Sequence, residues 1–526
     1  MGGRKRSSRN IGGPPAKRSK ANASQADDDI PTFQSQSTAP STSTFSIRDP
    51  HAADHLPSLA TICLRAFAGN MQKLSSDPET WEDVKYSLRE LPDVLVQKVF
   101  AACRQICPTL LTHALIAPYF LRGSSVVLSS DLPGVNRSTL FAIGDMPSRD
   151  KLRELELPGF SKIADSVFAS VVAKLPSLRK LNLRGCTKVG SDTAHSAANH
   201  CPQLEVVNFN YTAVPAMALA PLLQNCSHLE VLKVAGIVSW TDHACAKLWS
   251  VLRASGDFQL PNLRSLKLRQ ASVGDASVNP ILAVCPNLRR LDLSFNPIKH
   301  PVLPSGKLLE KLVLTSTNVS GNELVSLVTG LPGLKVLSLG AMGGNEFTTA
   351  TISQESGTTI TDDILRAITD ALEDCHALER VSLVWNTRIG FNAGPGPRAA
   401  LAQFIRRVGR RCTHLNLSGI LHLRPSHLEG LAPDGPEEGP PRLEYLNLNN
   451  TPVDDNAIPY LSACTNLKTL ELAGTRVTKV GLLHLLDACK DLEKLDLTSC
   501  RGVRIGERRR FFEVWEEWKN EERRLH

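Results

Sequence analysis

The stretch LEKLDLTSC at residues 492–500 contains the pattern that decides the fold of this chain. Leucines occupy its first, fourth and sixth positions, and a turn residue follows. LRKLNLRGC at 178–186 and LRRLDLSFN at 288–296 repeat the same spacing. Because apolar and polar residues alternate in each stretch, the pattern predicts a short strand with its leucines on one side and its polar side chains on the other.

Thirteen copies of this pattern run through most of the 526 residues. Eight of the twelve steps between neighbouring copies are 21–26 residues long, within the range of about 20–29 residues that is typical of leucine-rich repeats. One repeat cannot bury its own apolar face, so neighbouring repeats are expected to stack. The sequence therefore predicts an α/β fold, a leucine-rich-repeat solenoid built as a right-handed α/β horseshoe. The first positions of the copies are Leu152, Leu178, Leu204, Leu229, Leu263, Leu288, Leu309, Leu334, Leu378, Cys412, Leu443, Leu467 and Leu492.

Six of the thirteen cysteines stand three residues before the first position of a copy. They are predicted to be small core residues with reduced thiols. The one spacing close to that of a zinc site is Cys103 with Cys107, and no second pair accompanies it, so neither a metal nor another cofactor is expected. Polar residues that follow the strands are expected to bond the backbone of the turn. The six cysteines are Cys201, Cys226, Cys285, Cys375, Cys464 and Cys489, and the turn residues are Asn296, Thr317, Thr451, Thr475 and Cys500.

Four copies have the forms CPQLEVVNF (201–209), CPNLRRLDL (285–293), CTNLKTLEL (464–472) and CKDLEKLDL (489–497). In these forms the chain resembles the cysteine-containing leucine-rich repeats of ribonuclease-inhibitor-like solenoids, over residues from about 150 to 505. This subclass is common among the substrate receptors of cullin ubiquitin ligases. The resemblance therefore implies a receptor function.

The N-terminal segment, residues 1–55, is rich in Ser, Thr, Gly, Pro and charge, and is predicted to be a disordered basic arm. Its first 26 residues contain seven basic residues and no acid, while the formal charge of the whole chain is +8. The remainder is therefore near neutral and is not a general nucleic-acid binder. Two basic clusters ten residues apart match a bipartite nuclear import signal, which favours the nucleus, with the cytoplasm as a further location. The alternative is a solvated arm that touches nucleic acid weakly. The import residues are Arg4, Lys5, Arg6, Lys17, Arg18 and Lys20.

The predicted solenoid spans residues 125–505 and is interrupted at 341–361, 391–398 and 432–441, which are predicted to be extruded loops. The segment 506–526 is predicted to be a capping helix that covers the last apolar layer, and a helix that docks a partner is the alternative. No run of 18 apolar residues occurs, so a membrane span is not expected. The apolar face of the terminal helix consists of Phe511, Val514, Trp515 and Trp518.

Residues 56–124 do not fit the repeat and are predicted to be helical. Leu59, Cys63 and Phe67 are four residues apart, which predicts one shared helix face. With Ser58 before Leu59, the segment resembles the BC-box by which cullin-ligase receptors dock Elongin C, and the physical mode implied is a helix lying in a groove. The stretch after it, which resembles a cullin box, extends from Leu91 and Pro92 through Leu95 to Val99.

Two other interpretations of this region stay open. In the first, the region is an amphipathic helix whose Leu59 and Cys63 face the solenoid as a cap. In the second, it is a degenerate F-box that binds a Skp-type adaptor, because LPDVLVQKVF (91–100) resembles an F-box opening. The order of basic arm, BC-box-like helix, Leu-Pro helix and cysteine-containing repeats also resembles the leucine-rich subunit of the global-genome nucleotide-excision-repair factor. That resemblance implies a nuclear DNA-repair role.

The outward strand positions of a solenoid line its concave face, which is the usual recognition surface. In the early and middle repeats these positions are mostly basic, so an acidic protein segment or a phosphate backbone is the expected complement, with an ordinary solvated face as the alternative. The predicted substrate-binding residues are Lys180, Arg184, Lys233, Lys267, Arg269, Arg290 and Tyr445.

The sequence thus predicts a non-catalytic substrate receptor that joins Elongin C or a Skp-type adaptor, a cullin and a protein substrate. The alternative is a scaffold subunit of a nuclear DNA-repair or chromatin complex without ligase activity. GxxxxGK[ST], HExxH and GxSxG do not occur, and the fourteen histidines are scattered. An enzyme activity, a small-molecule substrate and a membrane partner are therefore not expected.

Overall fold

The computed structural model describes residues 45–47, 58–254, 256–303, 308–343, 358–392, 398–435, 438–504 and 506–515. All of these residues belong to one compact unit, residues 40–526. The residues of the predicted import signal, between Arg4 and Lys20, lie outside the described part.

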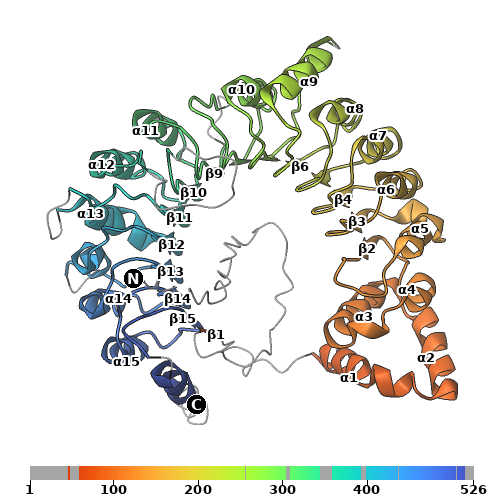
Figure 1. Ribbon diagram of the computed structural model, residues 1–526, viewed down its shortest axis with the longest axis horizontal. Coiled ribbons are helices and arrows are strands. Elements are labelled where there is room, and N and C mark those ends of the chain that lie inside the picture. Colours follow the sequence, from red (N-terminus) through yellow and green to blue (C-terminus); the bar gives the residue numbers. More distant parts are fainter. Residues whose placement is uncertain are drawn as a thin grey trace, which may run out of the picture. The chain divides into compact units, whose positions relative to one another are not determined.

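Fourteen parallel strands form a continuous sheet in this unit, and they follow one another in the order of the sequence. The strands line the inner side of an arc of repeats and the helices lie on its outer side (Figure 1). Strands β3 to β15 are the thirteen predicted copies, so the predicted fold class is confirmed. The strands are β2 (Ser125–Val127), β3 (Glu154–Glu156), β4 (Lys180–Asn182), β5 (Val206–Asn208), β6 (Val231–Lys233), β7 (Ser265–Lys267), β8 (Arg290–Asp292), β9 (Lys311–Val313), β10 (Val336–Ser338), β11 (Arg380–Ser382), β12 (His414–Asn416), β13 (Tyr445–Asn447), β14 (Thr469–Glu471) and β15 (Lys494–Asp496).

Four helices precede the repeats, and shorter helices alternate with the strands. The first group is α1 (Leu59–Leu74), α2 (Pro78–Glu90), α3 (Asp93–Ile106) and α4 (His113–Tyr119). The α-helices of the repeats are α5 (Arg137–Asp145), α6 (Asp165–Val172), α7 (Ser191–His200), α8 (Ala220–Asn225), α9 (Asp242–Ala254), α10 (Asp275–Ala283), α11 (Gly321–Thr329), α12 (Asp362–Ala371), α13 (Ala400–Arg407), α14 (Ile458–Leu461) and α15 (Lys479–Ala488). The 3-10 helices are η2 (Pro108–Leu110), η3 (Arg149–Lys151), η4 (Ala216–Leu219), η5 (Gly409–Arg411), η6 (Pro425–Leu431) and η7 (Asp455–Ala457).

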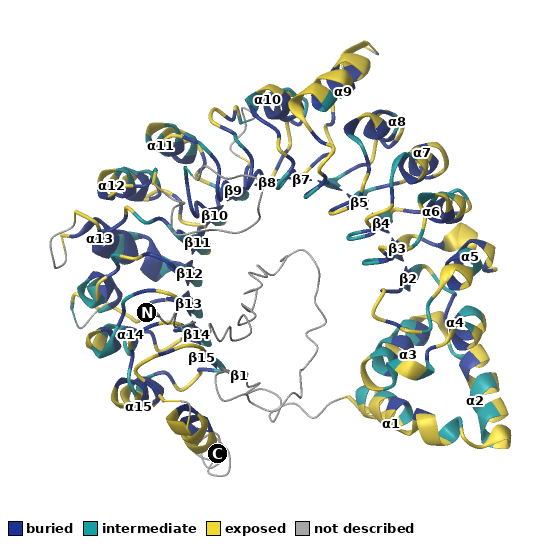
Figure 2. Cartoon of the chain, viewed as in Figure 1, coloured by how far each residue is buried: buried dark blue, intermediate teal, exposed yellow. Residues whose placement is uncertain are grey.

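The core lies between the strands and the helices, as the dark inner layer of Figure 2 shows. The middle residue of each repeat strand is buried and stands beside its counterpart in the next strand, as Leu155 does beside Leu181. Burying a leucine side chain contributes roughly 1.5–3 kcal/mol. A ladder of such residues therefore holds neighbouring repeats in register.

The six repeat cysteines are all buried. The thiols of four of them, Cys201, Cys226, Cys375 and Cys489, donate to main-chain carbonyls of the preceding repeat; Cys201 Sγ lies 3.3 Å from Leu175 O, and Cys489 Sγ lies 3.4 Å from Cys464 O. Burial raises the pKa of Cys201 and of Cys285 to about 12. The prediction that these cysteines are small core residues is confirmed.

Polar side chains close the turns after the strands, as the sequence predicted. The Thr451 hydroxyl donates to Leu448 O at 2.6 Å, and Asn296 Nδ2 donates to Leu268 O of the preceding repeat at 2.7 Å. Each bond gives a buried carbonyl its partner, which removes a desolvation cost of about 1–3 kcal/mol. Thr317, Thr475 and Cys500 make corresponding bonds.

One strand lies inside the segment predicted to be a disordered arm. Strand β1 (Phe45–Ile47) pairs with β15 in antiparallel register, with Phe45 beside Asp496. The prediction of disorder over 1–55 is therefore wrong for these three residues. It was based on the scarcity of large apolar side chains, whereas main-chain bonds to an edge strand form with any sequence except proline.

Two arginines hold the insertion 432–441 against the outer layer. Arg406 Nη1 lies 2.6 Å from Asp434 Oδ2, and Arg410 Nε lies 3.2 Å from Glu438 Oε1. Arg410 is buried and its Nη2 also donates to Gly439 O at 2.6 Å. This loop is therefore fastened to α13 and η5, while parts of the other two predicted loops, 344–357 and 393–397, lie outside the described residues.

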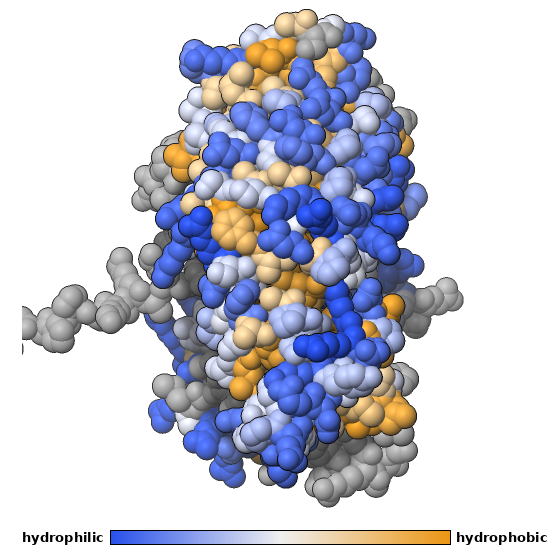
Figure 3. All heavy atoms as spheres, turned by 90° about the vertical axis from the view of Figure 1, so that its right-hand side faces the viewer, coloured by the Kyte–Doolittle hydropathy of each residue, from blue (hydrophilic) through white to orange (hydrophobic). Residues whose placement is uncertain are grey.

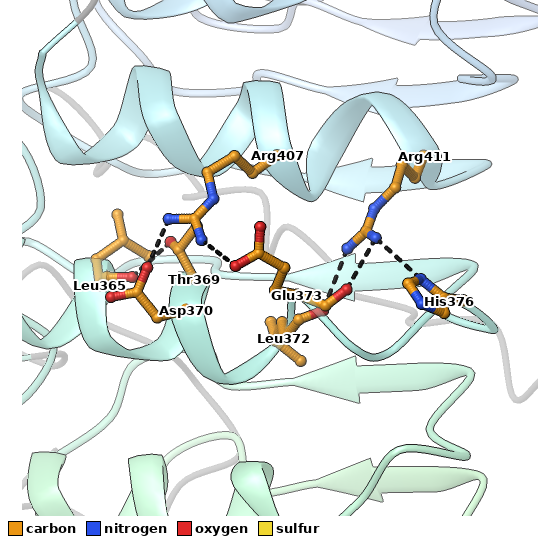
Figure 4. A network of polar contacts seen from close by, with 8 residues as sticks. All are labelled: Leu365, Thr369, Asp370, Leu372, Glu373, His376, Arg407 and Arg411. Carbon is orange, nitrogen blue, oxygen red and sulfur yellow. Dashed lines mark hydrogen bonds and ion pairs between the residues drawn. The ribbon is translucent and has the colours of Figure 1, made fainter.

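A polar network joins α12 to α13 and η5 across the insertion at 391–398 (Figure 4). Arg407 contacts Asp370 Oδ1 at 2.5 Å and Glu373 Oε2 at 2.6 Å. Arg411 donates to Leu372 O at 3.1 Å. These bonds keep the two outer helical segments stacked although an insertion separates them in the sequence.

In the described part, no helix has both the length and the apolar character that crossing a bilayer requires.

Candidate functional site

Helix α1 packs on the rest of the N-terminal helices through one of its faces. Ala68 and Met71 are buried, and Phe67 is partly buried against the same core. The thiols of Cys103 and Cys107 on and after α3 donate to Met71 Sδ at 3.4 and 3.5 Å. Cys103 and Cys107, the one pair with a spacing close to that of a metal site, thus contact Met71. These contacts hold the second half of α1 against α3.

The opposite face of α1 begins with an exposed apolar row, which we call the α1 stripe: Leu59, Ile62 and Cys63. Leu59 is 76% exposed, Ile62 is 47% exposed, and Cys63 is exposed. The spacing i, i+3, i+4 places the three side chains side by side on one helix face. Ser58 caps the helix, because its hydroxyl accepts from Thr61 N at 3.2 Å. The cap holds Leu59 in the first helical turn.

The predicted shared face of Leu59, Cys63 and Phe67 is wrong for Phe67. Residues four apart on a helix advance by about 40° at each step, so Phe67 lies about 80° from Leu59. That angle turns Phe67 toward the core while Leu59 stays in solvent. The interpretation of α1 as a cap whose Leu59 and Cys63 face the solenoid is contradicted, because both side chains are exposed.

Apolar side chains on the neighbouring outer face gather in small patches separated by hydrophilic ones (Figure 3). Such scattered apolar exposure is normal for a folded surface. The α1 stripe differs in its regularity, because it forms one row on one helix. A regular row of this kind is the feature by which an amphipathic helix enters a groove.

The α2–α3 junction contains the second predicted docking segment. Pro92 and Val94 are exposed, while Leu91 and Leu95 are partly buried. Arg122 fixes the junction, because its guanidinium donates to Leu88 O, Arg89 O and Leu91 O at 2.6–2.8 Å. The end of α2 and the start of α3 are thus held in one arrangement, with Pro92 and Val94 facing solvent.

The thirteen cysteines all lie in the described part of the chain, and Cys63 alone is exposed. Thiolates react and thiols do not, and burial raises the pKa of each of the six repeat thiols, to about 12 for Cys201, Cys285 and Cys464. We therefore expect a maleimide or an aromatic disulfide to modify one thiol per chain rapidly under native conditions. The others should react only on unfolding. Absence of the fast phase in a Cys63→Ser variant is the check, and a fast phase that survives this substitution would contradict the exposed position of Cys63.

Three of the predicted concave residues lie on three successive strands, Lys233 on β6, Lys267 on β7 and Arg290 on β8. Lys233 stands beside Lys267 in the sheet, and Arg290 stands beside Lys311. Lys267 Nζ also lies 3.8 Å from Asp292 Oδ2. Positive charge is therefore concentrated over β6 to β9, where one carboxylate, Asp292, stands among five cations: Lys233, Lys267, Arg269, Arg290 and Lys311.

Other predicted concave residues have close neighbours of their own. Lys180 Nζ lies 2.7 Å from Glu156 Oε1 on the preceding strand. The guanidinium of Arg184 lies 6.0 Å from the ring centroid of Tyr211, and that of Arg269 lies 4.7 Å from the ring centroid of Phe295. These cation–π contacts orient the two guanidinium groups on the surface.

Tyr445 belongs to a separate polar network at the C-terminal end of the concave face. Its ring stacks on His414 at 5.5 Å, and its hydroxyl accepts from Asn447 Nδ2 at 3.1 Å. Asn447 and Asn449 both donate to Glu471 Oε2, at 2.6 and 2.9 Å. Burial, with Glu471 nearby, raises the pKa of the Tyr445 hydroxyl. The structure therefore does not bring Tyr445 together with the predicted basic residues.

Some residues of both surfaces were missed in the sequence. Ile62 completes the α1 stripe, and its spacing from Leu59 could have identified it. Lys311 and Arg380 occupy the same outward strand position as Arg290, in the copies LEKLVL and LERVSL. Among the described residues, no group of three or more His, Cys, Asp or Glu side chains is placed to hold a metal ion.

The comparisons with known proteins agree on the repeat. The family description "Leucine Rich repeat" matches residues 284–299. The chain is similar to a protein of Eremothecium gossypii named Antagonist of mitotic exit network protein 1, with 33% identity over 152 residues. That match covers 27% of this chain and 36% of the relative, so the chain spans about a third of the length of the relative that it matches.

Among solved structures, the chain is similar to the Rad7 and Elc1 complex in yeast, with a TM-score of 0.50, 20% identity, and coverage of 81% of this chain and 96% of the matched chain. It is also similar to a leucine-rich-repeat protein of Leptospira interrogans, with a TM-score of 0.38, 14% identity, and coverage of 75% and 89%. At such identities the first likeness establishes the fold, a leucine-rich-repeat solenoid preceded by helices.

Proposed function

We propose that this chain is a non-catalytic substrate receptor of a cullin-type ubiquitin ligase. In this proposal the α1 stripe docks an Elongin C-type adaptor, and the concave face of the repeats holds the protein to be modified. The observation that carries it is the exposed row of Leu59, Ile62 and Cys63 on a helix that the fold anchors by its other face.

The energetics of the α1 stripe favour docking. An apolar side chain that stays in water gains nothing from folding, whereas burying Leu59 in a groove contributes roughly 1.5–3 kcal/mol. Because Ser58 caps α1 and Met71 anchors it to α3, the helix is formed before a partner arrives. A preformed helix loses little conformational entropy on binding.

Two further observations support this assignment. One of the solved structures that are similar to the chain is the complex of Rad7 and Elc1 in yeast, in which we take Elc1 as an Elongin C-type partner. The segment of Leu91, Pro92 and Leu95 lies where α3 begins, and Arg122 holds it by donating to Leu91 O. We assign this junction to the cullin, through its exposed Pro92 and Val94.

The basic arm completes the proposal. The two clusters, from Arg4 to Arg6 and from Lys17 to Lys20, direct the chain to the nucleus, where its substrates would be found. Replacing Lys17, Arg18 and Lys20 together should shift a fluorescent fusion of the chain to the cytoplasm.

The decisive experiment measures binding of purified Elongin C to the full chain by calorimetry. We expect the Leu59→Ala/Ile62→Ala variant to bind at least tenfold more weakly, because it removes most of the apolar contact area of the stripe. Cys63 should also react more slowly with a maleimide when Elongin C is bound.

Helix α15 supplies a matched control. Val480 and Leu483 have the same spacing as Leu59 and Ile62, and they are 65% and 47% exposed. The Val480→Ala/Leu483→Ala variant should bind Elongin C as the wild-type chain does. If wild-type chain binds neither Elongin C nor a Skp-type adaptor, the receptor function is wrong and the scaffold interpretation replaces it. Binding of a Skp-type adaptor alone would assign the N-terminal helices to an F-box.

A further inference from the structure

The outward positions of strands β4 to β11 are strongly basic. These positions are the first and third residues of each strand and the second residue after it. They hold eight basic residues and one acid, Asp292. The outward positions of β3 hold two acids, Glu154 and Glu156, and those of β14 and β15 hold two acids and one base, Glu471, Asp496 and Lys494. We call the eight residues the basic face: Lys180, Arg184, Lys233, Lys267, Arg269, Arg290, Lys311 and Arg380.

The basic face has a cost within the fold. Lys233 and Lys267 are register partners on adjacent strands, and so are Arg290 and Lys311. Like charges at directly neighbouring strand positions destabilise a sheet. The repeat does not require a basic residue at these positions, since β5 and β10 have Val206 and Val336 there. Local costs of this kind are typical of functional surfaces.

Apolar side chains lie between the basic ones. Val206 stands beside Val231 on β5 and β6, and Val336 stands beside Lys311 on β10 and β9. All of them are partly exposed. The face therefore offers contacts to aliphatic side chains as well as to anions, which a uniformly charged polyanion would not use.

The arginines of the face are suited to carboxylates. A guanidinium binds a carboxylate through two parallel hydrogen bonds. The ring contacts of Arg184 with Tyr211 and of Arg269 with Phe295 orient two of these groups. Phe295 is buried, so its ring does not offer an open face on which a nucleic-acid base stacks, whereas Tyr211 is 37% exposed.

The size of the face indicates the length of its ligand. Neighbouring strands are about 4.8 Å apart, so the eight strands from β4 to β11 span roughly 35 Å. An extended peptide advances about 3.3 Å per residue. About ten residues would therefore cross the whole face.

From these observations we infer that the basic face binds an extended acidic peptide segment of about ten residues, in which carboxylates alternate with aliphatic side chains. The inference rests on the proposed function, for which it names the class of substrate segment. Glu154 and Glu156 on β3 would repel an acidic ligand that extended past β4, and so limit the segment at that end of the basic face.

The test uses the full chain and a fluorescein-labelled peptide of twelve residues in which Glu and Asp alternate with Leu and Val. We expect fluorescence anisotropy to show binding that weakens as salt is added. The Lys233→Gln/Lys267→Gln variant and the Arg290→Gln/Lys311→Gln variant should each bind about tenfold more weakly, since each loses two charge-assisted contacts. The Lys233→Gln/Lys267→Gln variant also loses the ion pair of Lys267 with Asp292, so urea unfolding of both variants is measured beside binding to show that each is folded.

The matched control is Lys247→Gln/Arg253→Gln, which makes the same change of charge on exposed positions of α9 in the outer layer. It should leave peptide binding unchanged, and a peptide with Gln and Asn in place of Glu and Asp should not bind. Equal losses in the control and in the face variants would overturn the inference. Tighter binding of single-stranded DNA of equal charge than of the peptide would also overturn it and assign the face to nucleic acid.

Elongin C binding is measured on the same proteins. If the wild-type chain binds Elongin C but not the peptide, the inference alone is overturned. If the wild-type chain binds the peptide but not Elongin C, the proposed ligase attachment is overturned and the acidic ligand of the face stays in place.

Discussion

An Asn386→Ala variant is expected to unfold with a free energy lower by at least about 3 kcal/mol than that of the wild-type chain. Asn386 is buried in the turn after β11. Its Nδ2 donates to Leu339 O at 2.7 Å and to Leu383 O at 2.9 Å, and its Oδ1 accepts from Met342 N at 3.2 Å. Alanine would leave these three main-chain groups without their partner in the core, at a cost of about 1–3 kcal/mol for each. Urea unfolding followed by circular dichroism measures the change.

The position of Asn386 explains why this cost is large. It joins two repeats at the longest step of the chain, the 44 residues between Leu334 and Leu378. A short repeat is held close to its neighbour by the chain that connects them. At this long step, the bonds of Asn386 to Leu339 and Met342 supply part of that link between repeats.

Asn287→Ala is the matched control for Asn386→Ala. Asn287 also bonds a carbonyl of the preceding repeat, Pro261 O at 2.9 Å, but it is exposed. Water replaces the lost donor there, so we expect a change of less than about 1 kcal/mol. Equal losses in the two variants would show that burial does not set the cost, and the account of the turn asparagines would be wrong.

The repeats were predictable because their signal is local. The leucine spacing identified the strands from β3 to β15, since each copy carries its own periodicity. Strand β2 was not among the predicted copies, because Gly123 stands where the first leucine would be and only Val126 and Leu128 remain of the pattern. Asn386 was missed too, although it occupies the ninth position of its copy, as Asn296 does.

The two candidate surfaces depend on contacts that the sequence does not contain. Helix α1 has apolar residues on two faces, and only its packing on α3 through Met71 decides that Leu59 remains exposed. On the concave face, Lys180 and Arg290 look equivalent in the sequence. The neighbouring strand gives Lys180 the carboxylate of Glu156 and places Lys311 beside Arg290.

This separation of surfaces has a functional consequence. The α1 stripe belongs to the helices before the repeats, while the basic face belongs to the strands, and the residues that hold α1 in place are not residues of the sheet. A receptor built in this way would keep its attachment to a ligase when its strand residues change. Substitutions on the concave face should therefore alter which protein is bound without altering adaptor binding.

A Trp515→Ala variant is expected to lose about 3–5 kcal/mol of stability, concentrated at the C-terminal end of the repeats. Trp515 is buried in the helix at 506–515, and its ring lies 6.1 Å from that of Phe512. Arg508 of the same helix is buried and donates to Leu497 O at 2.9 Å, directly after β15. Removing the indole would open a cavity under the helix and expose the last apolar layer. Hydrogen exchange of the amides of β14 and β15 should therefore become faster than that of β4 and β5.

Val514→Ala separates covering the last repeat from docking a partner. Val514 neighbours Trp515 in the chain but is 49% exposed, so its truncation should change the free energy of unfolding by less than about 1 kcal/mol. If Trp515→Ala leaves the stability and the exchange of β15 unchanged, the helix does not cover the repeats, and its aromatic side chains would instead serve a partner. If the loss is local to β14 and β15, the helix closes the solenoid, because a stack of repeats has no further repeat to bury its last face.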